Sequence, residues 1–89
     1  MNLKKNTAQK IRIEIYSKND CHLCEEAKAV LSKVQKEVPF ELREIDITRD
    51  VMLFHKYKEQ IPVVFVNDRK AFKFVVNEKK LRKKLSRLL

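Results

Sequence analysis

Two cysteines are the residues of this sequence whose type and spacing point most directly to chemistry. Cys21 and Cys24 are the only cysteines in the 89-residue chain, and His22 and Leu23 separate them. Positions i and i+3 share one face of a helix, so the two sulfur atoms can meet. A thiolate is the nucleophile in thiol–disulfide exchange, and a helix start favours it. The pair therefore predicts a redox-active disulfide.

The two cysteines are expected to have different roles. Cys21 lies nearer the expected helix start, where unpaired backbone N–H groups favour a thiolate, so we expect it to attack a substrate disulfide. Cys24 lies one turn deeper and resolves the mixed disulfide. Lys18 and His22 are close enough in sequence to add positive potential near the sulfur, and Asp20 would oppose them.

Other uses of the cysteine pair remain open but are less favoured. A disulfide that closes so short a loop contributes only about 2 kcal/mol to stability in the chain-entropy model, so a purely structural role for the pair is less favoured. A closed zinc site needs about four ligands, and besides the cysteines the chain offers only His22 and His55. A metal or iron–sulfur site would need cysteine pairs from two chains. A c-type haem is excluded because Glu25 follows Cys24. We expect no metal and no cofactor.

The elements that position the cysteines follow from hydrophobic periodicity. Residues 11–16 alternate apolar and polar side chains and end at a turn-rich cluster, which predicts a strand followed by a loop. From residue 21 to about residue 38 apolar side chains recur every three or four positions, which predicts a helix. Asn19 or Asp20 is the expected N-cap. The cysteines therefore lie where a strand leads into a helix.

The remaining chain predicts two more helices and three more strands. Residues 40–47 indicate a second strand with an irregular middle. Thr48 to Asp50 offer a turn and a cap for a short helix with Val51 and Phe54 on its apolar face. Ile61-Pro62 leads into an apolar run at 63–66, and residues 71–75 can pair with that run across a loop at 67–70. Asn77 caps a last helix. The order β-α-β-α-β-β-α predicts an α/β fold with a mixed sheet.

The aromatic residues and the second histidine are assigned to structure rather than to a site. Five aromatic side chains fall where a core needs large apolar groups, so we expect packing rather than base stacking. They are Phe54, Tyr57, Phe65, Phe72 and Phe74. His55 lies on the expected short helix, away from the cysteines in sequence, and we expect it to face solvent or pack on the helix.

From residue 11 to about residue 88 the chain resembles the glutaredoxin-like branch of the thioredoxin superfamily, especially small glutaredoxin-like proteins with a C-x-L-C-E-E-A segment. The matching segments are residues 21–27, 44–47 and 61–64. The resemblance implies a thioredoxin-like α/β fold, a four-stranded mixed sheet flanked by three helices. It also implies a disulfide oxidoreductase that acts on protein or low-molecular-weight disulfides and takes electrons from a thiol donor.

The resemblance also assigns a substrate-binding segment. It implies that Pro62 follows a cis peptide bond and faces the redox pair, and that the backbone of Ile61 pairs with a bound substrate like an added strand. Ordinary glutaredoxins carry a glycine pair after the last strand, where this chain has Val75 and Val76. β-Branched residues are poorly tolerated at positive φ, so we expect the protein to handle glutathione poorly.

The excess positive charge lies at the two ends of the chain. The formal net charge is +9; residues 1–10 contribute +3, residues 11–68 contribute −2 and residues 69–89 contribute +8. We interpret the last helix as having a solvated basic face rather than a nucleic-acid site. The alternative function is a non-enzymatic binding module that uses this helix to hold an acidic protein or nucleic acid.

Length and patterning predict one domain at residues 11–89, preceded by a basic flexible arm at residues 1–10. No stretch approaches the roughly 18 apolar residues of a membrane span, so we expect no membrane partner. The first ten residues lack the apolar core of a secretory signal. We therefore expect a monomer in the cytoplasm.

Overall fold

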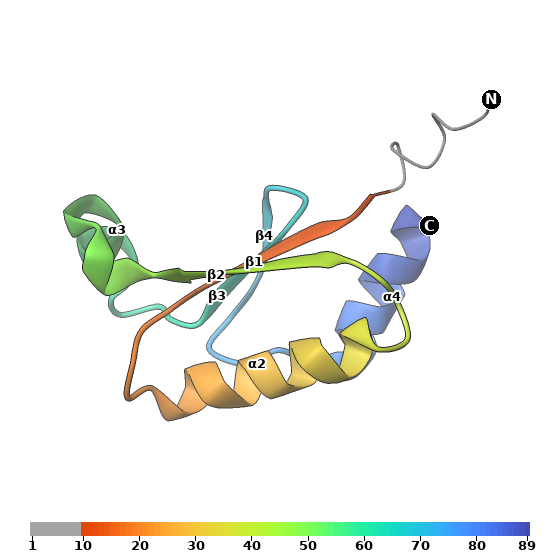
Figure 1. Ribbon diagram of the computed structural model, residues 1–89, viewed down its shortest axis with the longest axis horizontal. Coiled ribbons are helices and arrows are strands. Elements are labelled where there is room, and N and C mark those ends of the chain that lie inside the picture. The colour runs from red at the N-terminus through yellow and green to blue at the C-terminus, as the bar shows by residue number, and fades with distance from the viewer. Residues whose placement is uncertain (1–9) are drawn as a thin grey trace.

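A computed structural model describes residues 10–89 (Figure 1). Its elements follow the predicted order and are β1 (Arg12–Ser17), α2 (His22–Gln35), β2 (Glu41–Asp46), a 3₁₀ turn η1 (Ile47–Arg49), α3 (Val51–Tyr57), β3 (Val63–Val66), β4 (Arg69–Lys73) and α4 (Glu78–Leu88). The arm expected at residues 1–10 lies outside the described residues except for Lys10.

The four strands form one mixed sheet in the order β2-β1-β3-β4. β1 and β2 are parallel, with Arg12 opposite Glu41 and Ser17 opposite Asp46, whereas β3 runs antiparallel to both β1 and β4. A parallel pair needs a crossover connection, and α2 provides it. This arrangement confirms the predicted fold, a four-stranded mixed sheet with three helices.

Helices α2 and α4 cover one face of the sheet (Figure 1). Alternation along the strands sends Ile13 and Ile15 to this face, where they pack against Leu31 of α2 and Leu81 and Leu85 of α4. All five side chains are buried. The apolar positions predicted along α2 therefore form its core-facing side.

A second buried cluster lies on the other face, against α3. Tyr57 of α3 meets Tyr16 of β1 edge to face, with ring centroids 4.9 Å apart, and Phe65 of β3 lies 5.3 Å from Tyr16. Cys24 and Ile61 belong to the same cluster. The short helix α3 therefore closes the end of the molecule where the cysteines lie.

The second strand and the short helix differ in detail from the predictions. β2 pairs regularly along its whole length and ends at Asp46, while Ile47 begins the 3₁₀ turn. Asp50 caps α3 as expected, by accepting a hydrogen bond from the Leu53 amide. Val51 is 73% exposed, so its assignment to the apolar face was wrong. Val51 is the first residue of α3, and Tyr57 is the residue of this helix that is buried.

The β3–β4 hairpin is tighter than predicted. Its turn consists of Asn67 and Asp68 alone, at φ values of 48° and 68°, and β4 begins already at Arg69. Asn and Asp tolerate this left-handed conformation better than other non-glycine residues, so a chain without glycine can make the turn. Arg12 fixes the turn to β1, since its guanidinium lies 2.8 Å from the Asp68 carboxylate.

The chain leaves β4 through a bend at Phe74, which has a φ of 69°. Val75 and Val76 come directly after this residue and are not at positive φ, so the steric reason given for poor handling of glutathione does not apply to them. The core position expected for Phe74 was wrong, since Phe74 is 41% exposed. The Phe74 amide donates a hydrogen bond to the Pro62 carbonyl, at 2.8 Å. That hydrogen bond sets the residue at which the chain turns away from the sheet toward α4.

Among residues 10–89, no helix combines the length and the apolar character that a membrane crossing requires.

Candidate functional site

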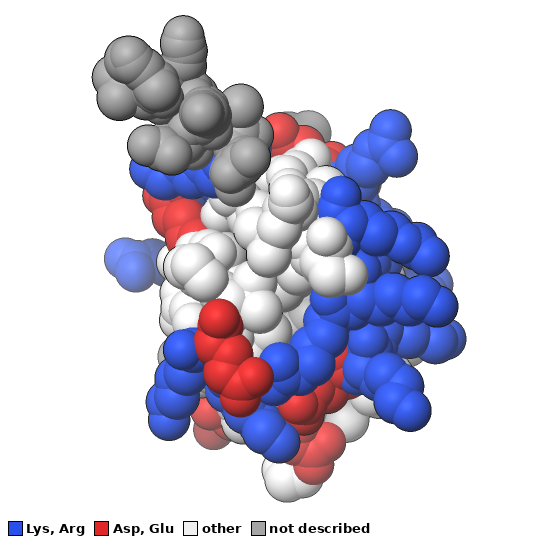
Figure 2. All heavy atoms as spheres, turned by 90° about the vertical axis from the view of Figure 1, so that its right-hand side faces the viewer, with Lys and Arg blue, Asp and Glu red and all other residues white. Residues whose placement is uncertain are grey.

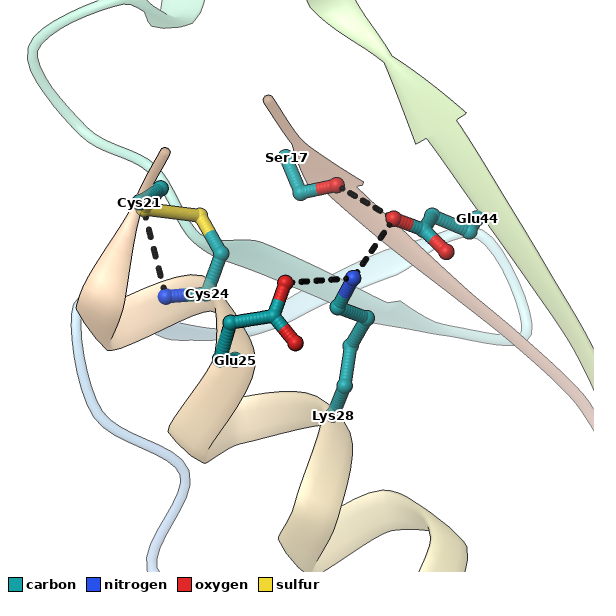
Figure 3. The surroundings of a disulfide bond; sticks show 6 residues. All are labelled: Ser17, Cys21, Cys24, Glu25, Lys28 and Glu44. Atoms are coloured by element: carbon teal, nitrogen blue, oxygen red, sulfur yellow. Dashed lines mark hydrogen bonds and ion pairs between the residues drawn. A yellow bond between two sulfur atoms is a disulfide. The ribbon is translucent and has the colours of Figure 1, made fainter. Parts of the chain in front are cut away.

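Cys21 and Cys24 form a disulfide at the start of α2, with their Cα atoms 5.2 Å apart. Cys21 itself is the N-cap of the helix: its backbone is extended and its sulfur accepts a hydrogen bond from the Cys24 amide, at 3.2 Å (Figure 3). The expectation that Asn19 or Asp20 caps the helix was wrong. Asp20 has a φ of 55° and turns the chain, so the first residue in capping geometry is Cys21.

The two cysteines differ in burial. Cys24 is fully buried and packs against Ile47, Tyr57 and Ile61, whereas Cys21 is half-buried at the edge of the same cluster. An incoming group therefore reaches the sulfur of Cys21 before that of Cys24. The geometry suits an attacking residue at position 21 and a resolving residue at position 24.

Charged residues next to the disulfide partly offset one another. The imidazole of His22 is largely exposed, and its Nε2 lies 2.8 Å from the Glu26 carboxylate one turn further along α2. The negative charge of Glu26 therefore offsets the positive potential that His22 was expected to add near Cys21. The backbone N–H groups at the start of α2, one of which donates to the Cys21 sulfur, favour a negative charge there.

A polar network that was not predicted from the sequence connects the first turns of α2 to the sheet (Figure 3). The ammonium of Lys28 lies 3.0 Å from Glu25 on its own helix and 2.9 Å from Glu44 on β2. The buried Ser17 at the end of β1 donates a hydrogen bond to the same Glu44 oxygen, at 3.1 Å. Only the Glu25–Lys28 spacing was visible in the sequence; the contact with Glu44 depends on the crossover.

Two groups near the site have raised pKa values. Hydrogen bonds to Glu44 and then Glu25 raise the pKa of Lys28 above its ordinary value, so its ammonium keeps its proton in the network. Burial, followed by the charge of Glu14, raises the pKa of Tyr16. Both groups therefore stay protonated at neutral pH.

The predicted substrate segment lies beside the cysteines. The Ile61–Pro62 peptide bond is cis, as the resemblance implied, and both residues are buried. Ile61 packs in the cluster that contains Cys24. Within residues 10–89 neither the amide nor the carbonyl of Ile61 has a backbone hydrogen-bond partner. The structure thus brings Ile61 to Cys24 and leaves its backbone groups unpaired.

His55 does not join the cysteines. It is exposed on α3, and its ring contacts Phe54 with centroids 6.0 Å apart, which confirms a surface or packing role. Across the part of the chain that the structure describes, no three or more His, Cys, Asp or Glu side chains gather as a metal site would require.

Comparisons with known proteins agree with this arrangement. Residues 12–86 match the model of the glutaredoxin-like domain (DUF836). A "Glutaredoxin-like protein YDR286C homolog" from Dictyostelium discoideum is 30% identical over 90 residues, which cover 94% of this chain and 83% of that protein.

Solved structures give the same result. The solution structure of protein Ne2328 from Nitrosomonas europaea is 28% identical, with a TM-score of 0.73 over 84% of this chain and 91% of that one. Thioredoxin from Fasciola hepatica is 21% identical, with a TM-score of 0.63 over 98% of this chain and 88% of that one, and shows the shared fold. The chain belongs to the glutaredoxin-like domain family (DUF836) of the thioredoxin superfamily.

Proposed function

We propose that the protein is a thiol–disulfide oxidoreductase that cycles Cys21 and Cys24 between dithiol and disulfide. The observation that carries the proposal is the asymmetric pair at the start of α2, with a half-buried N-cap sulfur at Cys21 and a buried partner at Cys24. An N-cap sulfur that accepts a backbone N–H is stabilised as a thiolate once the disulfide is reduced.

The reaction proceeds in two exchange steps. The Cys21 thiolate attacks one sulfur of a substrate disulfide, forms a mixed disulfide and releases the other substrate sulfur as a thiolate. Deprotonated Cys24 then attacks the Cys21 sulfur, closes the Cys21–Cys24 disulfide and releases the second substrate thiolate. Two electrons pass to the substrate. A thiol donor reduces the protein again by the same two steps in reverse.

The backbone of Ile61 is the proposed docking point for the substrate chain. Its amide and carbonyl lack backbone partners within the described residues, and the residue packs beside Cys24. An extended segment that pairs with these groups would present its disulfide to Cys21 in the manner of an added strand. Pro62, which follows directly, has no N–H to donate and so leaves the Ile61 pairing as the principal backbone contact.

The proposed substrates are disulfides of proteins or small thiols, with a dithiol donor preferred to glutathione. Phe74 and Val75 are 41% and 64% exposed next to the Pro62 carbonyl that binds the Phe74 amide. We propose that these exposed side chains obstruct the approach of a small peptide thiol such as glutathione. We further propose that the protein works as a monomer in the reducing cytosol, where thiol donors are available.

The decisive experiment is a redox titration of the purified protein. Protein equilibrated with mixtures of reduced and oxidised glutathione is quenched with an alkylating agent, and mass spectrometry counts the free thiols. We expect one reversible two-electron transition between a dithiol and an intramolecular disulfide. Cys24→Ser, which lacks the resolving thiol, should instead accumulate a mixed disulfide at Cys21.

The matched control is Cys21→Ser, in which only the buried thiol remains. Its mixed disulfide should form far more slowly than that of Cys24→Ser. A wild-type protein that keeps two free thiols across the whole range of mixtures, or that forms only intermolecular disulfides, contradicts the proposal.

A further inference from the structure

An open pocket of about 390 Å³ lies between the β3–β4 hairpin and the end of α4. Its apolar surface comes from Val66, Ala71 and Leu88, and its cations include Arg69, Lys84 and Arg87. Figure 2 looks at the end of the molecule where α4 ends and shows Lys and Arg side chains gathered beside a strip of uncharged surface. Among residues 10–89, no acidic side chain lines the pocket.

The pocket cations are free to bind an external group. Within residues 10–89, Arg69, Lys84 and Arg87 form no ion pair, whereas Arg82 on the same helix is held by two carboxylates. Residues 1–9 contain no Asp or Glu, so that segment has no carboxylate side chain to offer. The positive charge of the pocket is therefore not neutralised by the acidic side chains of its own chain.

We propose that this pocket binds an acidic peptide segment of a partner protein, with an apolar side chain as its anchor. Carboxylates pair with arginine through two parallel hydrogen bonds, and two of the four cations that line the pocket are arginines. The apolar surface suits one anchoring side chain of the peptide, since the volume is at the lower end of the range for small-ligand sites.

The same lining disfavours nucleic acid. Single-stranded nucleic acids bind by stacking bases on aromatic side chains along a basic groove, and no aromatic side chain of the described part of the chain lines this pocket. A phosphate backbone alone would use the cations but would leave the apolar surface of Val66, Ala71 and Leu88 without a partner. The combination of cations and aliphatic surface fits an acidic peptide better.

The pocket lies at the opposite end of the sheet from the disulfide. β3 starts next to Ile61 in the disulfide cluster and ends at Val66 in the pocket, a span of roughly 13 Å for a strand of this length. In Figure 1 the start of α2 and the end of α4 lie at opposite ends of the molecule. A peptide in the pocket would leave Cys21 accessible, and this site does not depend on the proposed redox function.

The test is a binding measurement on the full chain by fluorescence anisotropy. The probe is a labelled short peptide with a central leucine between Asp and Glu residues, compared with the same peptide carrying serine in place of the leucine. We expect saturable, salt-sensitive binding of the leucine peptide. Arg87→Glu should weaken it about tenfold, and the serine peptide should bind several-fold more weakly.

The matched control is Lys79→Glu, the same change of charge on the same helix at an exposed residue outside the pocket. It should alter the affinity by less than about twofold, since exposed distant charges are screened. Circular dichroism confirms that each variant keeps its fold. If Lys79→Glu and Arg87→Glu lowered the affinity for the leucine peptide equally, binding would depend on the overall charge of α4 and not on the pocket, and the proposal would be wrong. Tighter binding of a thymidine oligonucleotide than of the leucine peptide would also overturn the proposal.

Discussion

Cys21 combines two functions that are usually separate, because it caps α2 with the same sulfur that forms the disulfide. The hydrogen bond from the Cys24 amide is available to that sulfur whether it is oxidised or reduced, and it becomes stronger when the sulfur carries charge. Cys24 lies inside the helix, fully buried among apolar side chains, where a charge is costly. The two thiols should therefore differ in chemistry as well as in access.

The first prediction is that Cys21 is the more reactive thiol. Each thiol is tested alone, Cys21 in the Cys24→Ser variant and Cys24 in the Cys21→Ser variant. Cys21 should react with a small alkylating agent about tenfold faster at neutral pH, because a larger fraction of Cys21 is present as thiolate. Rates measured across pH check this. Faster alkylation of the protein that retains only Cys24 would show that access and helix position do not control reactivity here.

The second prediction concerns Phe74, which holds a left-handed conformation without being glycine. Phe74→Gly relieves about 1 kcal/mol of backbone strain and adds a similar entropy cost in the unfolded chain, so unfolding free energy should change little. Removal of the exposed ring should raise turnover with glutathione several-fold. Steady-state assays and urea unfolding measure the two effects.

Val75→Gly is the matched control, because Val75 is not at positive φ and its replacement by glycine relieves no backbone strain. It should lower the unfolding free energy by about 1 kcal/mol. If both glycine variants destabilise equally, the conformation at residue 74 is not strained. Efficient, saturable turnover of the wild-type protein with glutathione would show that Phe74 and Val75 do not obstruct it.

At the scale of the elements, α2 is held at its start by side chains from two strands. Lys28 forms an ion pair with Glu44 on β2, and Glu44 also accepts a hydrogen bond from Ser17 on β1. α4 begins at a local cap, in which the Asn77 side chain accepts a hydrogen bond from the Lys80 amide at 2.9 Å, and its Glu78 pairs with Lys33 of α2 rather than with a strand. The two helices that cover one face of the sheet are therefore fixed in different ways.

The third prediction is a pH-dependent contribution from Lys28. Its folded pKa is raised above the ordinary value of about 10.5, so its stabilising effect is complete below that value and is lost as pH rises through the folded pKa. Lys28→Met should lower the unfolding free energy by about 1 kcal/mol at pH 7. The difference between wild type and variant should shrink above about pH 10.5.

Urea unfolding at several pH values measures this difference. Lys33→Met serves as the control, because it removes a more exposed ammonium from the same helix, paired only with Glu78. Lys33→Met should lower the unfolding free energy by less than Lys28→Met does at pH 7. A Lys28→Met penalty that is constant up to strongly alkaline pH would mean that the loss comes from packing and not from the ion pairs.

The fourth prediction compares two asparagines. Asn77→Ala removes the cap of α4 and should lower the unfolding free energy by about 1 kcal/mol. Asn19→Ala, at the position expected from sequence to cap α2, should change it by less than about 0.5 kcal/mol because Cys21 makes the cap. Thermal or urea unfolding of both variants decides this. Equal losses would mean that Asn19 contributes to the start of α2 after all.

At the scale of the whole molecule, stability rests on the two clusters that pack against the sheet and very little on the disulfide. The bridge joins residues three positions apart and restrains the unfolded chain weakly. One cluster joins β1 and β3 to α2 and α4, and the other joins them to α3. A protein of this design can open and close its disulfide while it keeps its fold.

The fifth prediction is therefore that the reduced protein stays folded. Reduction, or the double change of Cys21 to Ser and Cys24 to Ala, should lower the unfolding free energy by no more than about 2 kcal/mol. Urea unfolding with and without reductant measures the loss, and near-ultraviolet circular dichroism should keep its aromatic signal. Cooperative unfolding on reduction alone would make the bridge a structural staple and weaken the proposed redox cycle.

Features that depend on residues close together along the chain could be predicted before the structure was known. The period of two at residues 11–16 and the period of three to four from Cys21 predicted β1 and α2, because a strand and a helix each repeat at their own spacing. The cysteine spacing predicted the disulfide, and Asn77 was recognisable as a cap because capping acts within one turn. The resemblance supplied the cis peptide bond before Pro62, which periodicity does not reveal.

Contacts between residues far apart along the chain became visible only once the fold was known. Ile61 packs beside Cys24, and Lys28 reaches Glu44, because the sheet register and the α2 crossover bring them together. The bend at Phe74 instead of Val75 follows from a hydrogen bond to Pro62, twelve positions earlier in the chain. Arg69 and Arg87 share a pocket because the hairpin lies against the end of α4. Such contacts join segments far apart along the chain, so no local pattern of residues encodes them.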